Sequence, residues 1–163
     1  MAKRVFLDLN RCIGCHSCSA ACYYAHSGNG AVSFAPLSKG EGIPSICRHC
    51  EEPPCVAACP RNALQKRDDG GIVRMNMLCI GCRSCTYACP FGVIDADLSS
   101  HVVSKCDLCV SRTSEGKEPA CVTGCPSGAL YFDEVPDVAR EYTFVGGRAG
   151  RRYPVARGGG GAR

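Results

Sequence analysis

The fold of this chain is decided by the stretch from Cys79 to Pro90, C-I-G-C-R-S-C-T-Y-A-C-P. Its cysteines follow the spacing C-x2-C-x2-C-x3-C, and a proline comes directly after the last one. Bacterial iron–sulfur proteins use this spacing to bind one [4Fe-4S] cluster with three thiolates and to send the fourth to a neighbouring cluster. The stretch therefore indicates a cluster-binding unit that folds together with a second one.

The same kind of group occurs four times, because 16 of the 163 residues are cysteine. The groups are Cys12, Cys15, Cys18, Cys22; Cys47, Cys50, Cys55, Cys59; Cys79, Cys82, Cys85, Cys89; and Cys106, Cys109, Cys121, Cys125. The first has the spacing of the third, and proline follows the last cysteine of the other three. We therefore predict that all sixteen cysteines are metal ligands, that they hold four [4Fe-4S] clusters, and that the chain transfers electrons.

Disulfides and zinc are the alternative uses of so many cysteines. Residues Met1 to Asn10 contain neither an apolar signal core nor a small-residue cleavage site, so we expect a reducing, cytoplasmic location in which disulfides are disfavoured. Pairs such as Cys106 and Cys109 could close a tetrahedral zinc site. A zinc site, however, requires neither the third cysteine of each run nor the proline that follows the last cysteine. The spacing therefore favours clusters.

Composition limits the rest of the prediction. A chain of 163 residues forms one compact unit or two small lobes, and its apolar fraction of 45% includes the sixteen cysteines. The clusters must therefore replace part of the hydrophobic core, and we expect the chain without them to be largely unfolded or prone to aggregate.

The net charge of +4 does not indicate nucleic-acid binding. An oxidised cluster with four thiolates carries about −2, which brings the loaded chain to about −4. Four basic residues lie beside ligands, namely Arg48, Arg83, Lys105 and Arg112. They either offset cluster charge and raise reduction potentials or form ordinary solvated surface.

An internal repeat organises the chain, since a short turn and an apolar pair follow each Cys-Pro. We predict a hairpin over Ala63 to Asn76 around Asp-Asp-Gly-Gly, and less clearly a second over Val93 to Lys105. A strand over Arg4 to Leu9 is expected to pair with Ala129 to Val135. Further expectations are short helices over Ser17 to His26 and Ser84 to Ala88, and loops over Ser27 to Ser45 and Ser111 to Pro119.

The strand pairing suggests how the groups share ligands, because it brings the first group to the last and leaves the second beside the third. The nested scheme is Cys12, Cys15, Cys18 and Cys125 for cluster 1; Cys47, Cys50, Cys55 and Cys89 for cluster 2; Cys79, Cys82, Cys85 and Cys59 for cluster 3; and Cys106, Cys109, Cys121 and Cys22 for cluster 4. A sequential scheme, which joins the first group to the second and the third to the fourth, stays open.

The domain prediction separates a four-cluster domain over 1–145 from a basic tail over 146–163. Within the domain, lobe A takes about 1–26 and 100–145, and lobe B takes about 46–99. The tail holds five arginines and seven glycines and cannot form a core of its own. It is expected to be disordered when free, and docking of the tail on an acidic partner is favoured over nucleic-acid binding.

The motifs that carry a family resemblance are C-I-G-C-H-S-C-S-A-A-C from Cys12, I-C-R-H-C-E-E-P-P-C-V-A-A-C-P from Ile46, C-I-G-C-R-S-C-T-Y-A-C-P from Cys79, and the split pair K-C-D-L-C from Lys105 with C-V-T-G-C-P from Cys121. Over about Lys3 to Val135 the chain resembles the four-cluster ferredoxin-type electron-transfer subunits of multi-subunit oxidoreductases. One departure is Tyr23, where proline would follow Cys22. The local turn is expected to differ there.

The resemblance implies an α+β fold of two pseudo-symmetric bacterial-ferredoxin-like modules, with short hairpins and short helices around four iron–sulfur clusters. It also implies the nested ligation. The chain looks most like small subunits that serve tungsten aldehyde oxidoreductases, carbon monoxide dehydrogenases, formate dehydrogenases or hydrogenases, with the first type preferred. The implied partners are a larger tungsten or molybdenum pterin subunit, a flavin subunit or ferredoxin, and other copies of this chain, without a membrane span.

No catalytic constellation is visible in the sequence, so we expect a non-catalytic subunit that relays single electrons. His16 and His49 lie next to ligands and could donate to a cluster, but exposed histidines are favoured, and His26 and His101 carry no signal. The alternatives are a free-standing or polymerising polyferredoxin and a zinc-bound structural or nucleic-acid module.

Overall fold

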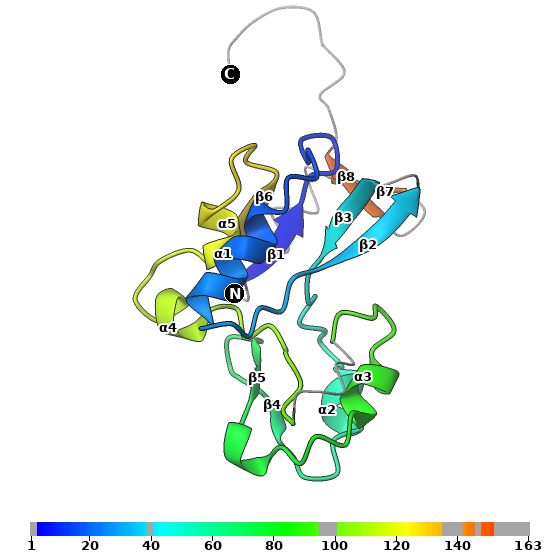
Figure 1. Ribbon diagram of the computed structural model, residues 1–163, viewed down its shortest axis with the longest axis vertical. Helices are drawn as coiled ribbons and strands as arrows, with labels where there is room; N and C mark the ends of the chain where they lie inside the picture. Colours follow the sequence, from blue (N-terminus) through cyan, green and yellow to red (C-terminus); the bar gives the residue numbers. More distant parts are fainter. Residues whose placement is uncertain (1–2, 39–40, 95–100, 135–141, 146–147, 152–163) are drawn as a thin grey trace, which may run out of the picture.

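The chain folds into short helices and two-stranded sheets in a computed structural model that describes residues 3–38, 41–94, 101–134, 142–145 and 148–151 (Figure 1). The elements in chain order are β1 Lys3–Leu7, α1 Ser17–Ala25, β2 Ser33–Ser38, β3 Glu41–Ser45, α2 Pro54–Ala57, β4 Leu64–Lys66, β5 Ile72–Arg74, the 3₁₀ helix η1 Asn76–Leu78, α3 Ser84–Ala88, α4 Val110–Thr113, α5 Ala120–Thr123, β6 Leu130–Glu134, β7 Tyr142–Val145 and β8 Arg148–Arg151. This is the α+β class expected from the sequence. Within these described ranges, none of the helices is both long and apolar enough to cross a membrane.

Strands β1 and β6 are far apart in the sequence but pair with each other. β1 and β6 are antiparallel, with Lys3 opposite Glu134 and Leu7 opposite Leu130. The backbone N–H of Asp8 extends the ladder by donating to Ala129 O at 2.8 Å. The pairing predicted between Arg4 to Leu9 and Ala129 to Val135 is confirmed, and it brings the first cysteine group to the last.

The predicted hairpin over Ala63 to Asn76 is also confirmed. β4 pairs with β5 in antiparallel register, with Leu64 opposite Arg74. Gly70 takes a φ of +76° in the turn, which glycine adopts without the steric cost of a Cβ. The carboxylate of Asp69 accepts the N–H of Gly71 at 2.8 Å, so the Asp-Gly pair closes the hairpin.

Two segments expected to be loops contain regular structure. Within Ser27 to Ser45, β2 and β3 form an antiparallel ribbon with a register shift between Pro36 and Ser38. A two-stranded ribbon tolerates proline because its outer edges need no ladder hydrogen bonds. Within Ser111 to Pro119, the chain continues helix α4, and Arg112 Nε closes the loop by donating to Glu118 O at 2.9 Å.

The predicted boundary of the tail differs from the structure as well. β8, Arg148–Arg151, pairs with β7, so four residues assigned to a disordered tail belong to a hairpin. Two-stranded pairing satisfies backbone groups without any core of its own, which is why the composition did not reveal it. Residues 152–163 lie outside the described residues, as do 95–100 in the less clear hairpin predicted over Val93 to Lys105.

The described residues form two hydrophobic cores, and cysteines make up a large part of both. One contains Cys47, Cys55, Leu64, Ile72, Cys85, Val93, Ile94 and Val103, and the other Cys18, Cys22, Val32, Cys121, Val122 and Leu130. Figure 1 shows α2, α3, β4 and β5 around the first core and α1, α5, β1 and β6 around the second. Val103 belongs to the first core although its segment was assigned to lobe A, so the segment before Cys106 connects the two cores.

Candidate metal centres

Each cysteine group begins with a loop in which the residue before the second cysteine has a left-handed backbone. The φ angles are +64° at Gly14, +47° at His49, +67° at Gly81 and +59° at Leu108. Glycine adopts this conformation freely, whereas His49 and Leu108 are held there by their surroundings, since both side chains are buried. The local geometry of the quoted C-I-G-C run therefore recurs in all four groups, including the two without glycine.

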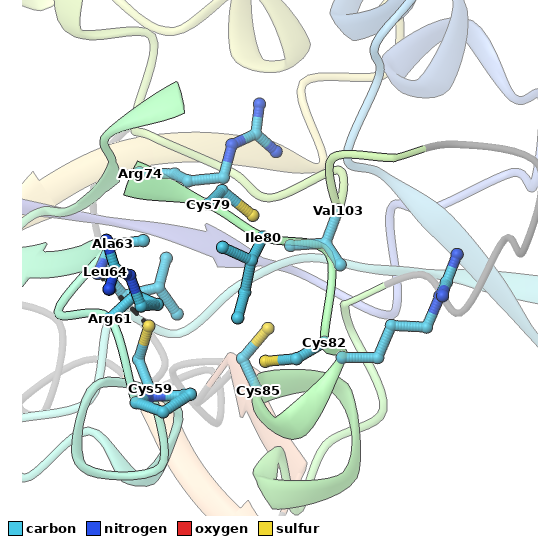
Figure 2. A pocket seen from close by; sticks show the side chains of 12 residues that line it. Cys59, Arg61, Ala63, Leu64, Arg74, Cys79, Ile80, Cys82, Cys85 and Val103 are labelled. Atoms are coloured by element: carbon cyan, nitrogen blue, oxygen red, sulfur yellow. Dashed lines mark hydrogen bonds between the residues drawn. The ribbon is translucent and has the colours of Figure 1, made fainter. Parts of the chain in front are cut away.

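The third group forms a hollow together with the last cysteine of the second. Cys79, Cys82, Cys85 and Cys59 line it, and Leu64, Ile80 and Val103 complete an apolar wall. Figure 2 shows the four cysteine side chains around one shared space, carried by the turn after α2, by the loop that leads into α3 and, for Cys85, by α3 itself. Arg61, Arg74 and Arg83 also line the hollow. A site that combines four thiols with an apolar wall and cationic side chains matches the donor set and the negative charge of an iron–sulfur cluster.

Two further hollows are also lined by four cysteines each. One is lined by Cys12, Cys15, Cys18 and Cys125, and the other by Cys47, Cys50, Cys55 and Cys89. In each, three cysteines come from one group and the fourth is the last cysteine of another.

Of the remaining four cysteines, Cys22 lies on α1 and Cys121 on α5, two helices that pack together, whereas Cys106 lies before helix α4 and Cys109 at its start. Burial, together with the smaller effects of the nearby thiols of Cys109 and Cys22, raises the pKa of the Cys121 thiol to about 12. Burial likewise raises the pKa of Cys106, on which the thiols of Cys47 and Cys121 also act. Thus Cys22 lies beside the last group, while Cys106 lies between that group and the second.

Backbone amides point at several of the sulfur atoms. The donors are Ala31 N to Cys22 Sγ at 3.3 Å, Ala63 N to Cys59 Sγ at 3.2 Å and Ala120 N to Cys109 Sγ at 3.4 Å. An N–H donor favours the thiolate over the thiol, and the thiolate is the form that binds metal. These three amides are therefore placed to donate hydrogen bonds to the ligand sulfurs of a bound cluster.

Serine hydroxyls do the same for three cysteines nearer the surface. Ser17 Oγ lies 3.4 Å from Cys15 Sγ, and Ser84 Oγ lies 3.5 Å from Cys82 Sγ. These hydrogen bonds lower the pKa of both exposed thiols. At Cys125, burial acts in the opposite direction, but the Ser127 hydroxyl and the backbone amides of Leu130 and Ala129 still lower the pKa.

The residues present fit an anionic metal cluster. Arg74 Nη1 is buried beside the hollow of Cys79 and has no hydrogen-bond partner in the described part of the chain. Burial lowers the pKa of this guanidinium, and the charges of Cys79 and Asp107 oppose that shift. A donor left unpaired in a buried position is costly. A cluster whose thiolates and sulfides carry net negative charge would supply the missing acceptor.

His49 differs from its prediction, whereas His16 agrees with it. His16 is exposed as expected and stacks on Phe34 with ring centroids 3.7 Å apart. His49 is 1% exposed; its Nδ1 accepts the N–H of Ile72 at 2.8 Å, and its Nε2 lies 3.5 Å from Cys106 Sγ. The expectation of an exposed histidine was wrong here because β5 and the Cys106 loop, both distant in sequence, cover the ring.

The structure adds detail on the basic residues beside the ligands. Lys105 Nζ lies 3.5 Å from Cys47 Sγ, so this cation contacts a sulfur atom directly. Arg48 lies over the ring of Phe91 at 4.2 Å, and Arg112 is held by Glu118. Sequence reasoning missed Arg74, which follows no cysteine closely, and it missed His26.

The imidazole of His26 reaches the last cysteine group from the end of α1. Its Nε2 lies 3.5 Å from Cys109 Sγ and 3.6 Å from the Asp107 carboxylate. No local motif marks His26 as a neighbour of Cys109, because 83 positions separate the two residues. They meet only because the fold brings the end of α1 to the last cysteine group.

Comparison with known proteins agrees with this chemistry. The family model of a 4Fe-4S dicluster domain matches residues 38–135, and a 4Fe-4S binding domain matches residues 3–24. The chain is 34% identical to a subunit of sulfite dehydrogenase from Allochromatium vinosum, with 85% of this chain and 71% of the relative covered. It is equally identical to a component of the anaerobic dimethyl sulfoxide reductase (84% and 76% covered) and to formate hydrogenlyase subunit 2 (86% of each), both from Escherichia coli.

Proposed function

Because this protein belongs to the 4Fe-4S dicluster domain family, we propose that it is a non-catalytic subunit that relays single electrons between a catalytic subunit and a second redox partner. The sixteen cysteines and the matching 4Fe-4S domains fit four [4Fe-4S] clusters. The observation that carries the proposal is that three hollows each combine three cysteines of one group with the last cysteine of another. The relatives are named as components of oxidoreductases, which supports the same role.

The ligand scheme that we propose is the nested one. The three hollows support clusters 1, 2 and 3 as the sequence grouped them, and the proximity of the Cys22 thiol to those of Cys109 and Cys121, whose pKa values it raises, supports cluster 4. The β1 and β6 pairing supports it further, because it brings the last group to the first.

We further propose that the sites follow one another in the order 1, 4, 2, 3. The thiol of Cys18 in site 1 raises the pKa of Cys121 in site 4, and the thiol of Cys47 in site 2 raises the pKa of Cys106 in site 4. Helices α2 and α3, which carry ligands of both sites 2 and 3, pack together. When bound, each cluster supplies the exchange of one electron at a time.

The protein surroundings separate the two ends of this series from its middle. Of the sixteen cysteines, Cys15 and Cys82 are exposed, and they belong to the terminal sites 1 and 3. Ile13 and Ile80, at the equivalent position of the two C-I-G-C runs, are exposed apolar residues beside them. Buried thiols such as Cys121 and Cys109 keep water away from the middle, whereas the ends are accessible to partners.

The finer assignments are proposals that rest on the sequence resemblance. We assign the catalytic partner to the tungsten or molybdenum pterin class, with a tungsten aldehyde oxidoreductase preferred, and a flavin subunit or another copy of this chain as a further contact. A cytoplasmic site is proposed because the thiols must be reduced during assembly. The two-lobe division, the pseudo-symmetric modules and a docking role for the basic tail are proposed as well, and the two separate cores support the first of these.

The experiment that tests the function is the iron and acid-labile sulfide content of protein purified without oxygen from its native host, with identification of every copurifying subunit. We expect about sixteen of each per chain together with a stoichiometric larger subunit that contains tungsten or molybdenum. About sixteen irons without any partner would instead favour a free-standing polyferredoxin. Little iron with about four zinc would overturn the proposal.

A further inference from the structure

Sites 4 and 2 of the proposed series meet at a single backbone residue, Ile72 of β5. Its N–H donates to His49 Nδ1 at 2.8 Å, and its carbonyl accepts a hydrogen bond from Lys105 Nζ at 3.1 Å. Ile72 is 1% exposed, so both polar side chains end inside the protein. The two residues come from different cysteine groups, and the strand holds them side by side.

The Ile72 amide fixes the proton of His49. Because Nδ1 accepts the amide hydrogen, the neutral ring carries its own hydrogen on Nε2. Nε2 lies 3.5 Å from Cys106 Sγ and therefore donates to it. His49 thus sits between two ligands of site 2, Cys47 and Cys50, but directs its hydrogen bond to a ligand of site 4.

Lys105 makes the reverse connection. It directly precedes Cys106 in the chain, yet its ammonium lies 3.5 Å from Cys47 Sγ, a ligand of site 2. Two carbonyls hold the ammonium in place, those of Ile72 at 3.1 Å and Cys106 at 2.7 Å. Each site therefore sends one donor, from beside its own cysteine, to a sulfur of the other.

We propose that His49 and Lys105 form a reciprocal brace that raises the reduction potentials of the two inner clusters and fixes their separation. The brace rests on the proposed function, since it acts only if both sites hold clusters. A donor to a ligand sulfur stabilises the more negative, reduced cluster more than the oxidised one, and this raises the potential. At the outer sites, the exposed Cys15 and Cys82 instead lie beside the hydroxyls of Ser17 and Ser84.

The test uses four variants of the full chain that keep all sixteen cysteines. H49N retains a side-chain acceptor for the Ile72 amide and suits the left-handed φ of +47°, but it is too short to donate to Cys106. The longer side chain of H49Q reaches as far as the Nε2 atom of His49 does and restores a donor to Cys106. K105Q removes the cation. The matched control is H16N, since His16 also has a left-handed φ, +61°, but is exposed and stacks on Phe34.

Redox titration followed by electron paramagnetic resonance gives the midpoint potential of each cluster. The signals are first assigned with the variants C121A and C55A, because each should remove the signal of one inner cluster, that of site 4 or that of site 2. We expect H49N to make reduction of the Cys106 cluster about tenfold less favourable, a fall of about 59 mV for one electron. H49Q should recover most of this change, K105Q should lower the potential of the Cys47 cluster, and H16N should leave both inner potentials unchanged.

Two outcomes separate the brace from the function. If the wild-type chain fails to bind about sixteen irons, the proposed function fails. If it binds them, while H49N and K105Q keep full iron content and the wild-type potentials, the brace alone is overturned. Equal shifts at all four clusters would also overturn it, since they would reflect net charge and not a specific donor.

Discussion

Helices α1 and α3 begin from the same four-cysteine pattern but end differently. Both follow a left-handed residue, His16 in one and Arg83 in the other. α3 ends at Ala88, before Cys89 and Pro90, because the residue preceding a proline avoids the helical conformation. α1 runs on through Cys22 to Ala25, since Tyr23 stands where the other groups have proline.

The last cysteine of the first group, Cys22, accepts a hydrogen bond from a backbone amide, as Cys59 of the second group does. The two amides come from different distances along the chain. At Cys59, the donor is the amide of Ala63, four residues later. At Cys22, the donor is the amide of Ala31, nine residues later, after the chain has turned back over the helix end. Gly30 makes this return possible, because a Cβ there would lie only 3.1 Å from Tyr23 Cα. The comparison shows that the thiolate environment is preserved while the backbone that supplies it differs.

The largest effect is expected when the first group is forced to resemble the others. Y23P removes a helical N–H inside α1 and costs about 3 kcal/mol or more. It should also displace Ala31 from Cys22, so that site 4 is lost and iron falls from about sixteen to about twelve per chain. The matched control, Y23F, keeps the helical N–H at the same position and should keep its iron. Full iron content in Y23P would contradict this account.

The two C-I-G-C runs provide a second contrast. Alanine at Gly14 or Gly81 forces a left-handed backbone, which costs about 1 kcal/mol at each. At Gly81, the new methyl group would also collide with the His101 carbonyl, whereas at Gly14 its nearest neighbour is Gly42 O at 3.6 Å. G81A should therefore lose its visible cluster absorbance in denaturant faster than G14A. Equal rates would show that the His101 segment moves aside freely.

A smaller effect is expected at the glycine that packs on Tyr23. In G30A the added methyl group would lie 3.2 Å from Tyr23 N, and relief of this contact moves Ala31 away from Cys22. We expect about 1 kcal/mol of destabilisation and a lower midpoint potential for site 4 alone. G92A is the control for backbone strain elsewhere, because alanine there takes a left-handed φ of +60° while its methyl group meets no atom within 4 Å, and it should leave the potential of site 4 unchanged. An equal fall at site 2, which holds Cys89, would argue against this route.

The smallest effects are predicted for the two serines that lie beside the exposed cysteines of the terminal sites 1 and 3. S17A and S84A each remove one hydroxyl beside an exposed cysteine. Loss of this donor should lower the midpoint potential of only the site concerned, and by less than H49N does, since exposed hydrogen bonds compete with water. Redox titration of both variants tests this, and a shift at one end without the other would show that the ends are not equivalent.

Much of the framework could be predicted because local sequence determines it. Asp68 to Gly71 mark the β4–β5 turn, and proline marks the end of α3. The β2–β3 ribbon escaped prediction because Pro36, Gly42 and Pro44 disfavour strands in isolation. Packing of Phe34 on His16 helps to hold it.

The donors to the sulfur atoms divide in the same way. Ser17 and Ser84 lie two residues from their cysteines, so their contacts are local and recur with the motif. His49 meets Cys106 across 57 positions, and His26 meets Cys109 across 83. Such contacts depend on how the two cores pack, which no local pattern determines.

The exchange of ligands between groups is the central claim, and loss of Cys125 tests it most directly. In C125A, cluster-resolved electron paramagnetic resonance should show loss or conversion of the cluster held by Cys12, Cys15 and Cys18, with the cluster of Cys106, Cys109 and Cys121 intact. The hollow that Cys125 shares with the first group supports this expectation. Damage confined to the cluster of its own group, or to the third group, would contradict the nested arrangement.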